Sequence, residues 1–307
     1  MPYFLILLFI SSIAISETKT ILTDEALPKS ITIGVIPGGN PEVVRAQAVI
    51  LAEKIQKSMN IPVSIFISKN YNGLVEAVKN KKVDYAFLSA LTYVQAENDV
   101  ALKVLLKKTW SGPYYYSALV TLNSHLVQKS SNKKDINFKN MNPNDFKNKK
   151  IAFVDTSSTS GYLYPQVYLQ KNKFNDTSFK QVVISGSHSA SVEKLENGDV
   201  DLIAVFADDE KGQTGAWSRF SKNKKNKFKV LWVSDPIPND PIVVRAEFYN
   251  TYPKLTHELM SNLIDIQTDD DKTKLISEIM GQGPLMPATA KQYDPVREMN
   301  KISKIKM

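Results

Sequence analysis

The chain has 307 residues, of which 43% are hydrophobic and 23% charged, a composition typical of a globular protein large enough for two domains. It contains no cysteine, which excludes disulfides, thiolate metal sites, cysteine catalysis and a lipid anchor on an N-terminal cysteine. The net charge is +8, but the lysines are dispersed among asparagines without interleaved aromatic residues, so we expect no nucleic acid partner.

The first residues predict a secretory signal peptide. Residues 2–10 form an unbroken apolar run, and small residues follow it, with Ala14 and Ser16 at the spacing that a signal peptidase reads. The run is too short to cross a bilayer as a mature helix. We therefore assign residues 1–20 to the signal peptide and expect a periplasmic protein that is not a lipoprotein.

Short apolar strands alternate with helices after this segment. We expect strands at residues 29–37, 62–67 and 83–88, and helices at residues 40–55 and 71–79. The first helix has the start signals of Asn40 as cap and Pro41 in the first turn. Strands and helices that alternate with short joins predict an α/β fold whose mainly parallel sheet is flanked by helices.

The same series then recurs further along the chain. Strands are expected at residues 150–154 and 181–185, with a helix at residues 162–170 between them. Five residues around the last helix and strand of the first series recur at one offset (201 − 84 = 117): Val75, Glu76, Asn80, Val83 and Asp84 match Val192, Glu193, Asn197, Val200 and Asp201. This repeat predicts two similar α/β lobes.

Two β-rich stretches are expected to connect the lobes. Residues 114–121 leave the first lobe, and residues 230–244 return to it, with prolines that bar this segment from a central strand position. Residues 252–279 have a helical pattern and would complete the first lobe. We expect these parts: lobe one at 28–115 and 240–290, lobe two at 116–239, and a C-terminal tail at 291–307. Two lobes with two hinge crossings form a cleft that closes around a ligand.

A cluster of hydroxyl residues, Ser158, Thr159 and Ser160, lies where the first strand of lobe two meets a helix. A helix N-terminus presents unpaired amides and a partial positive charge, so an oxyanion there gains amide and hydroxyl hydrogen bonds together. The alternative is a plain helix cap, because Ser and Thr are favoured capping residues. Ligands in open α/β sheets lie at the carboxyl ends of strands, and His188 and Asp208 follow the next strands of this lobe.

The chain resembles the substrate-binding proteins of phosphonate, phosphite and phosphate-type ABC importers. The matching segments cover most of the mature chain in the expected order: 33–37, 83–88 leading to Thr92-Tyr93, Ser158–Tyr162, 185–188, 197–201 and 238–243. The resemblance implies a two-lobed periplasmic-binding-protein fold of type II, delivery of the ligand to an ABC permease, a monomeric state and no cofactor. Ser89-Ala90 departs from the family's glycine-proline turn, so the ligand's substituent stays open.

The resemblance also implies roles for single residues. Ser158, Thr159 and Ser160 would bind the phosphonate oxygens with hydroxyls and helix-end amides. Tyr93, from the other lobe, would donate its phenol to the same group. The alternative for Tyr93 is a core aromatic residue, since half-buried tyrosines are common.

Three further residues complete the predicted site. His188 would donate a hydrogen bond and, as a cation, add charge; the alternative is a structural loop histidine. Asp208 lies where aminoalkyl-phosphonate binders place a carboxylate near the ligand ammonium. An aspartate can also accept a hydrogen bond from a protonated oxygen of phosphite or phosphate. Asp240 would assist from the return crossing. Both aspartates have turn formation as the alternative.

Other functions have weaker support. Ser158, His188 and Asp208 could suggest a hydrolase triad, but no Gly-x-Ser-x-Gly elbow surrounds the serine, so we expect no enzyme. His125, His188 and His257 fall in no metal-ligand spacing. Two rivals stay open: binding of another small anion or a cofactor precursor, and a sensory ligand-binding module on the same fold.

Overall fold

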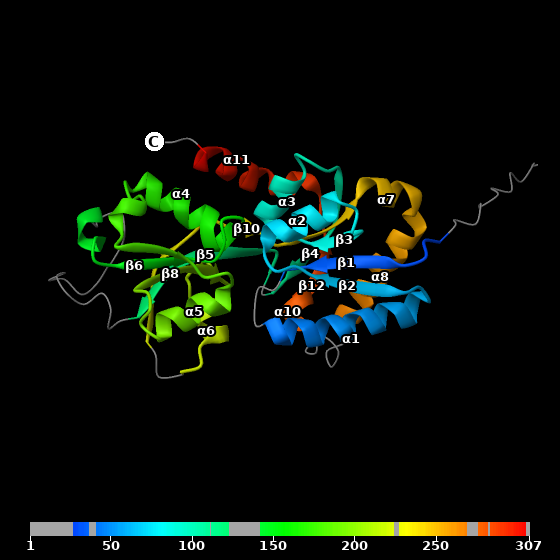
Figure 1. Cartoon of the computed structure of the whole chain (residues 1–307), viewed down its shortest axis with the longest axis horizontal. Helices are drawn as coiled ribbons and strands as arrows, with labels where there is room; N and C mark the ends of the chain where they lie inside the picture. The colour runs from blue at the N-terminus through cyan, green and yellow to red at the C-terminus, as the bar shows by residue number, and fades with distance from the viewer. Residues whose placement is uncertain are drawn as a thin grey trace, which may run out of the picture.

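The computed structural model describes residues 27–36, 41–110, 112–122, 142–223, 227–268, 276–281 and 283–304. The predicted signal peptide and the Asn40 cap lie outside these ranges. Within them the chain forms two mixed α/β lobes that lie side by side (Figure 1). No helix in the described part of the chain has the length and apolar content needed to cross a membrane.

Lobe one is built on a six-stranded sheet in the order β12-β4-β11-β3-β1-β2. Its elements are β1 (Ile31–Val35), α1 (Pro41–Met59), β2 (Val63–Ile67), α2 (Tyr71–Lys79), β3 (Tyr85–Phe87), α3 (Ala90–Ala96), β4 (Leu102–Thr109), β11 (Pro241–Arg245), α7 (Ala246–Thr251), α8 (Pro253–Thr268), α10 (Ser277–Met280) and β12 (Gly283–Pro287). The core between the sheet and α1, α8 and α10 contains the buried, apolar faces of β1 and α1, including Ile31, Ile33, Leu51 and Ile55.

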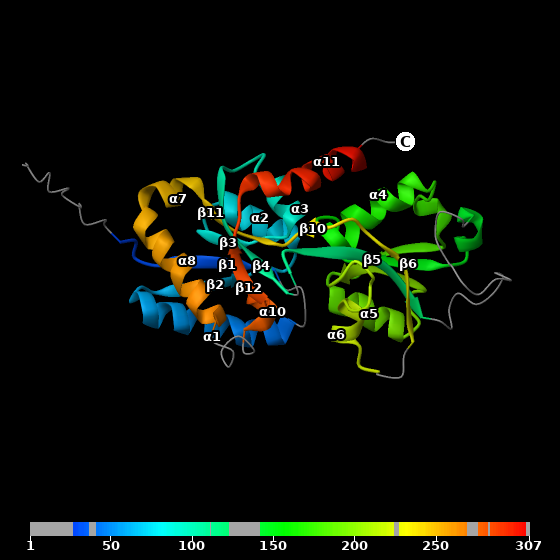
Figure 2. The same ribbon diagram turned by 180° about the vertical axis from the view of Figure 1, so that it is seen from behind.

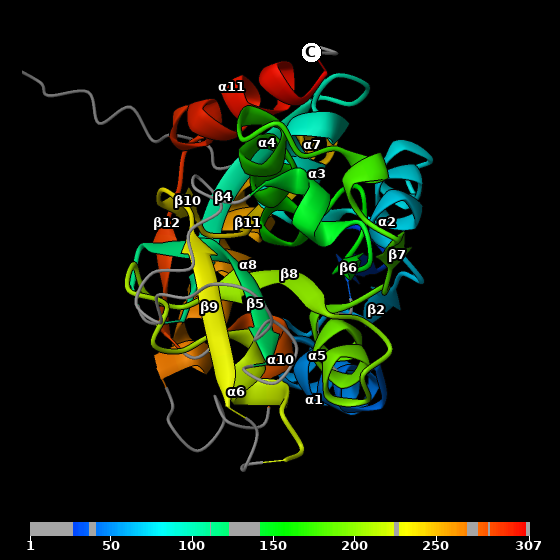
Figure 3. The ribbon, with the colours of Figure 1, turned by 90° about the vertical axis from the view of Figure 1, so that its left-hand side faces the viewer.

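Lobe two is built on a second sheet, in the order β10-β5-β8-β6-β7, with β9 also paired to β5. Its elements are β5 (Tyr114–Leu122), β6 (Lys150–Phe153), the π-helical turn η3 (Thr159–Leu163), α4 (Tyr164–Lys171), β7 (Gln181–Ile184), α5 (His188–Glu196), β8 (Leu202–Ala207), α6 (Ala216–Phe220), β9 (Phe228–Val233) and β10 (Ile237–Pro238), with short helices at Pro143–Phe146 and Asp176–Ser178. Figure 3 shows this sheet between α4 on one face and α5 and α6 on the other.

Each sheet combines parallel and antiparallel strands, whereas the sequence favoured mainly parallel sheets. The predicted strands β1, β2 and β3 are parallel to one another, as are β6, β7 and β8. β5 and β11, the first strands after the two crossings, run antiparallel to the core strands beside them, β8 and β3. β4 and β9 pair antiparallel with β11 and β5 in turn, so they run in the same direction as the parallel core.

One prediction about the return crossing is wrong. Its prolines were expected to keep it out of a central position, yet β11 lies between β4 and β3 in the middle of the sheet. Pro241 is the first residue of β11, so the residues after it keep their amides for the ladder. Pro238 belongs to β10, which pairs on one side only, with β5.

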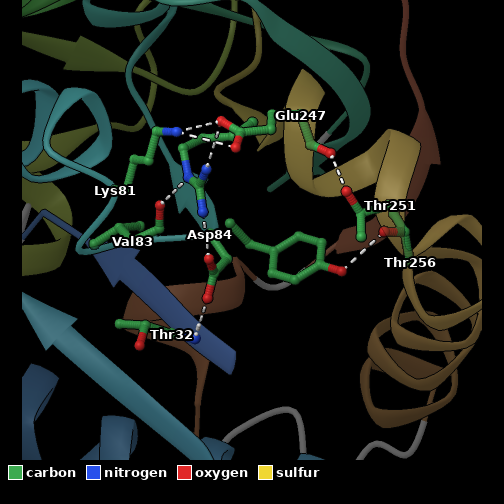
Figure 4. A network of polar contacts seen from close by, with 9 residues as sticks. Thr32, Lys81, Val83, Asp84, Glu247, Thr251 and Thr256 are labelled. Atoms are coloured by element: carbon green, nitrogen blue, oxygen red, sulfur yellow. Dashed lines mark hydrogen bonds and ion pairs between the residues drawn. The ribbon is translucent and has the colours of Figure 1, made fainter. Parts of the chain in front are cut away.

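The repeated aspartates Asp84 and Asp201 have the same structural role in the two lobes. Asp84 accepts a hydrogen bond from the amide of Thr32 in β1 at 2.9 Å, and Arg245 donates to its other oxygen at 2.7 Å (Figure 4). Asp201 accepts from the amide of Lys150 at the start of β6 at 2.8 Å. Each aspartate therefore joins the chain before one parallel strand to the first of the parallel strands in its sheet.

The lobes also share an apolar cluster on the side of the molecule where α11 (Asp294–Ser303) lies. Figures 1 and 2 show α11 along the join between the lobes, next to α3 of lobe one and α4 of lobe two. The cluster contains Leu91 and Val94 of α3, Tyr164 and Val167 of α4, and Val296 of α11, all buried. The expected C-terminal tail thus includes a helix, preceded by a short turn at Ala290–Tyr293, that packs against both lobes.

Candidate functional site

A cavity of about 110 Å³ lies where the two lobes face each other. Lobe one contributes the ends of β1, β3 and β4 and the start of α2, and lobe two contributes the ends of β6 and β8 with α5 and α6. Asn239 and Asp240, the two residues between β10 and β11, line it from the return crossing. The carboxyl ends of the parallel strands therefore converge on one polar space, as expected for an open α/β sheet.

The hydroxyl cluster lies in this cavity. Ser158, Thr159 and Ser160 all line it and are at most 2% exposed. Ser158 caps the helical turn that follows, because its hydroxyl accepts a hydrogen bond from the Gly161 amide at 3.1 Å. A Cβ on Gly161 would collide with Val154, so glycine allows the turn to pack on the end of β6. Capping and lining of the cavity are thus compatible roles of one segment.

Two tyrosines that sequence reasoning missed complete the hydroxyl cluster. Tyr71, at the start of α2, shares a hydrogen bond with the Ser158 hydroxyl, and Tyr115, at the start of β5, shares hydrogen bonds with Thr159 and Ser160. Burial raises the pKa of both phenols well above 10, so both remain protonated donors. The sequence could have indicated Tyr71, because ligands lie at the carboxyl ends of strands and Tyr71 is the first residue of the helix after β2.

The expectation for Tyr93 is wrong. Tyr93 is 1% exposed and lies outside the cavity lining, packed edge-on against Tyr293 at 5.1 Å between ring centroids. Arg297 of α11 donates to its phenol oxygen at 3.2 Å. The side chain of Tyr93 leaves α3 toward α11, so the core-aromatic alternative describes it. Tyr71 and Tyr115 supply phenols to the cavity in its place.

His188 lines the cavity but does not carry the charge expected of it. It is 7% exposed and packs edge-on against Phe206, and its Nδ1 is buried without a hydrogen-bond partner in the described residues. Burial, helped by the nearby Arg219 guanidinium, lowers the pKa of His188 to about 3. The imidazole is therefore neutral at neutral pH, and its Nδ1 makes no hydrogen bond within the described residues.

Asp208 and Arg219 form an ion pair at the lobe-two wall of the cavity. Arg219 Nη2 contacts Asp208 Oδ1, and both side chains line the cavity. Burial raises the pKa of Asp208, and Arg219 opposes that rise. Arg219 was not among the residues singled out in the sequence, because its position in the short helix α6 follows no strand end.

Asp240 lies at the hinge and faces the cavity. Lys108 Nζ, at the end of β4, is 3.5 Å from its Oδ2, and the Ala90 amide donates to the carboxylate. Burial raises the pKa of Asp240 despite this partner. Lys108 also lines the cavity, so each cation there is paired with a carboxylate. Among the described residues that line the cavity, neither Lys108 nor Arg219 is therefore left unpaired.

Polar contacts between the lobes converge on the segment that holds the hydroxyl cluster. The Leu91 amide of α3 donates to Thr159 Oγ1 at 2.8 Å. The hydroxyls of Ser89 and Thr92 each donate to the carbonyl oxygen of Ser157 at 3.1 Å. These bonds join the two sides of the cavity directly. In the described ranges, no group of three or more His, Asp or Glu side chains could hold a metal ion.

Comparisons with known proteins show which family the chain resembles. Residues 33–293 match a family model described as "ABC transporter, phosphonate, periplasmic substrate-binding protein". The chain is 25% identical over 299 residues to the phosphonates-binding periplasmic protein of Escherichia coli, with 95% of this chain and 82% of the relative covered. It is 28% identical over 233 residues to a phosphate-import protein of Mycolicibacterium smegmatis, with 72% and 68% covered.

A solved structure has a similar fold. The protein PhnD1 of Prochlorococcus marinus in complex with methylphosphonate superposes with a TM-score of 0.74 at 22% sequence identity, and the match covers 91% of this chain and 100% of that one. At this identity the likeness is evidence for the two-lobed fold.

Proposed function

Because this chain belongs to the family of periplasmic substrate-binding proteins of phosphonate ABC transporters, we propose that it captures a phosphonate- or phosphite-type oxyanion between its lobes. The protein then delivers this ligand to the permease of an ABC importer. The family places the protein in the periplasm and gives it a transport role.

The observation that carries this proposal is the buried hydroxyl cluster at the junction of β6 and η3. Ser158, Thr159 and Ser160, with the phenols of Tyr71 and Tyr115, form a concentrated set of donors in the cavity. A tetrahedral oxyanion accepts several hydrogen bonds at once, and donors held in place before binding lose little entropy. His188, Asp208 and Asp240 are proposed to complete the ligand shell from the cavity wall.

Several further assignments belong to the proposal. Residues 1–20 act as the signal peptide, the mature chain is not a lipoprotein, and the protein works as a monomer without enzymatic activity. The lobes comprise residues 28–115 with 240–290, and residues 116–239. The change of sheet between β10 and β11 supports the limit at residues 239–240, whereas the other change falls between β4 and β5, a few residues before the proposed limit at 115–116.

Isothermal titration calorimetry on the mature protein tests the proposal. The panel is phosphite, methylphosphonate, 2-aminoethylphosphonate, phosphate, sulfate and an amino acid. We expect binding at micromolar concentration or below for at least one of the first three compounds. Heat only from sulfate or the amino acid would show that the protein binds another class of ligand. A Thr159→Ala/Ser160→Ala double variant should lose several kcal/mol of binding free energy, since charge-assisted bonds contribute about 1.5–3 kcal/mol each.

A further inference from the structure

We propose that Arg219 sets the ligand class of this pocket: by pairing with Asp208 it excludes phosphonates whose substituent carries an ammonium group, and the pocket selects a short uncharged substituent. This inference rests on the proposed function, and it names the substrate class within that function. It concerns the part of the cavity lining formed by Asp208, Arg219, Trp110, Phe206 and Phe220.

The guanidinium of Arg219 is fixed on three sides. Its carbon lies 3.8 Å from the ring centroid of Trp110 and 4.7 Å from that of Phe206, and its Nη2 contacts Asp208. Trp110 follows β4 of lobe one, whereas Phe206 belongs to β8 of lobe two. The planar cation is therefore held between aromatic rings from both lobes, an arrangement that arginine adopts more readily than lysine.

The local chain keeps Arg219 and Asp208 together. The loop between β8 and α6 returns on itself, because the Asp208 amide donates to the Thr214 carbonyl oxygen at 2.9 Å. Asp209 accepts hydrogen bonds from the amides of Lys211, Gln213 and Thr214, which fixes the loop. Gly215 then approaches the carbonyl oxygen of Phe206 so closely that any Cβ would collide with it. Helix α6 begins at the next residue and places Arg219 over Asp208.

This arrangement removes the carboxylate from ammonium recognition. Side-chain exposure is 11% for Asp208 and 22% for Arg219, so the pair is largely withdrawn from solvent. An ammonium that approached Asp208 would lie beside the guanidinium, and repulsion between like charges is strong where water is sparse. His188 in the same wall is neutral, and the other members of the wall are aromatic rings. Such a surface fits a hydrogen, methyl or ethyl substituent on phosphorus.

The test compares ethylphosphonate with 2-aminoethylphosphonate, which share a phosphorus–carbon–carbon skeleton and differ by the ammonium group. We expect the unmodified protein to bind ethylphosphonate at least tenfold more tightly in calorimetry. Arg219→Met keeps much of the stacked volume and removes the charge, so it should reduce this preference at least tenfold or reverse it. Arg219→Lys keeps the charge and should retain the preference.

Further variants separate the outcomes. Adding Asp208→Asn to Arg219→Met should abolish the gain for 2-aminoethylphosphonate, because the gain depends on the released carboxylate. Thermal unfolding and ethylphosphonate affinity of Arg219→Met check that the pocket is intact. Equal or tighter binding of 2-aminoethylphosphonate by the unmodified protein would overturn this inference and leave the proposed function standing. Failure of every phosphonate and of phosphite to bind would overturn both.

Discussion

Thr159 Oγ1 of lobe two accepts a hydrogen bond from the backbone amide of Leu91 in lobe one, with 2.8 Å between the two atoms. The residue proposed to bind the oxyanion thus also joins the two sides of the cavity. Because Leu91 lies in the first turn of α3, the bond also satisfies an amide that has no partner within the helix. Closure of the lobes and order in the binding cluster are therefore coupled through one side chain.

Thr159→Val should separate the lobes and weaken binding. Valine has a similar shape but no hydroxyl, so the Leu91 amide would stay buried without a partner, at a cost of about 1–3 kcal/mol to the closed state. We expect a larger radius of gyration in small-angle X-ray scattering without ligand, and at least tenfold weaker phosphonate binding. Thr159→Ser keeps the hydroxyl and should resemble the unmodified protein. An unchanged radius and affinity in Thr159→Val would contradict this coupling.

Tyr71→Phe and Tyr115→Phe should each weaken phosphonate binding about tenfold. Each change removes one phenol that is hydrogen-bonded to the hydroxyl cluster, and one neutral hydrogen bond contributes roughly 0.5–1.5 kcal/mol. Tyr93→Phe is the matched control, because it removes a phenol that lies outside the cavity. Calorimetry with one phosphonate compares the three variants. A larger loss in Tyr93→Phe than in the other two would place the ligand elsewhere.

His188 should make folding stability depend on pH below neutrality. Its pKa is lowered from 6.5 to about 3, so below pH 6.5 the unfolded chain takes up a proton that the folded chain does not. Stability is therefore lost as the pH falls from 6.5 toward 3, by roughly 2 kcal/mol between pH 6.5 and 4.5. Urea unfolding at pH 7.5, 5.5 and 4.5 should show a smaller loss for His188→Gln. Equal losses in both proteins would indicate a His188 that is protonated in the fold.

Asp84 and Asp201 allow a paired stability test. Asp84→Asn breaks its 2.7 Å pair with Arg245, whose side chain is only 9% exposed and keeps a longer contact of 3.7 Å with the exposed Glu247, so the loss should be about 3 kcal/mol. The equivalent Asp201→Asn breaks a pair with Lys149, whose side chain is 29% exposed, and should cost about 1 kcal/mol. Chemical denaturation measures both free energies of unfolding. A smaller loss at Asp84 than at Asp201 would refute the assigned roles.

Much of the fold could be predicted from periodicity alone. The strands β1, β2, β6 and β7 and the helices α1 and α2 have apolar patterns that end at turn residues, and the structure has them within a few residues. The central position of β11 was not predicted, because three prolines in a short stretch usually indicate an edge. The pairing of β11 with β4 shows that Pro241 is the first residue of the strand, so the amides of the residues after it can form the hydrogen bonds of the sheet.

The site was predictable only in part. Ser158, Thr159 and Ser160 lie at a strand-to-helix junction, which local sequence reveals. The orientation of Tyr93 depends on Arg297, about 200 positions later, and the pairing of Asp208 depends on how the loop before α6 returns. The charge of His188 depends on its burial and on Arg219, which lies in another element of the lobe. Such relations between distant parts of the chain are absent from local patterns.

The position of β11 has a consequence for the order in which the protein folds. β11 lies between β3 and β4, although about 130 residues separate it from β4 along the chain. The sheet of lobe two needs only residues that lie between those two strands, so it can assemble without β11. The first half of lobe one, made earlier, must wait with a gap in its sheet until residues 241–245 arrive. The lobe that begins the chain is thus completed last.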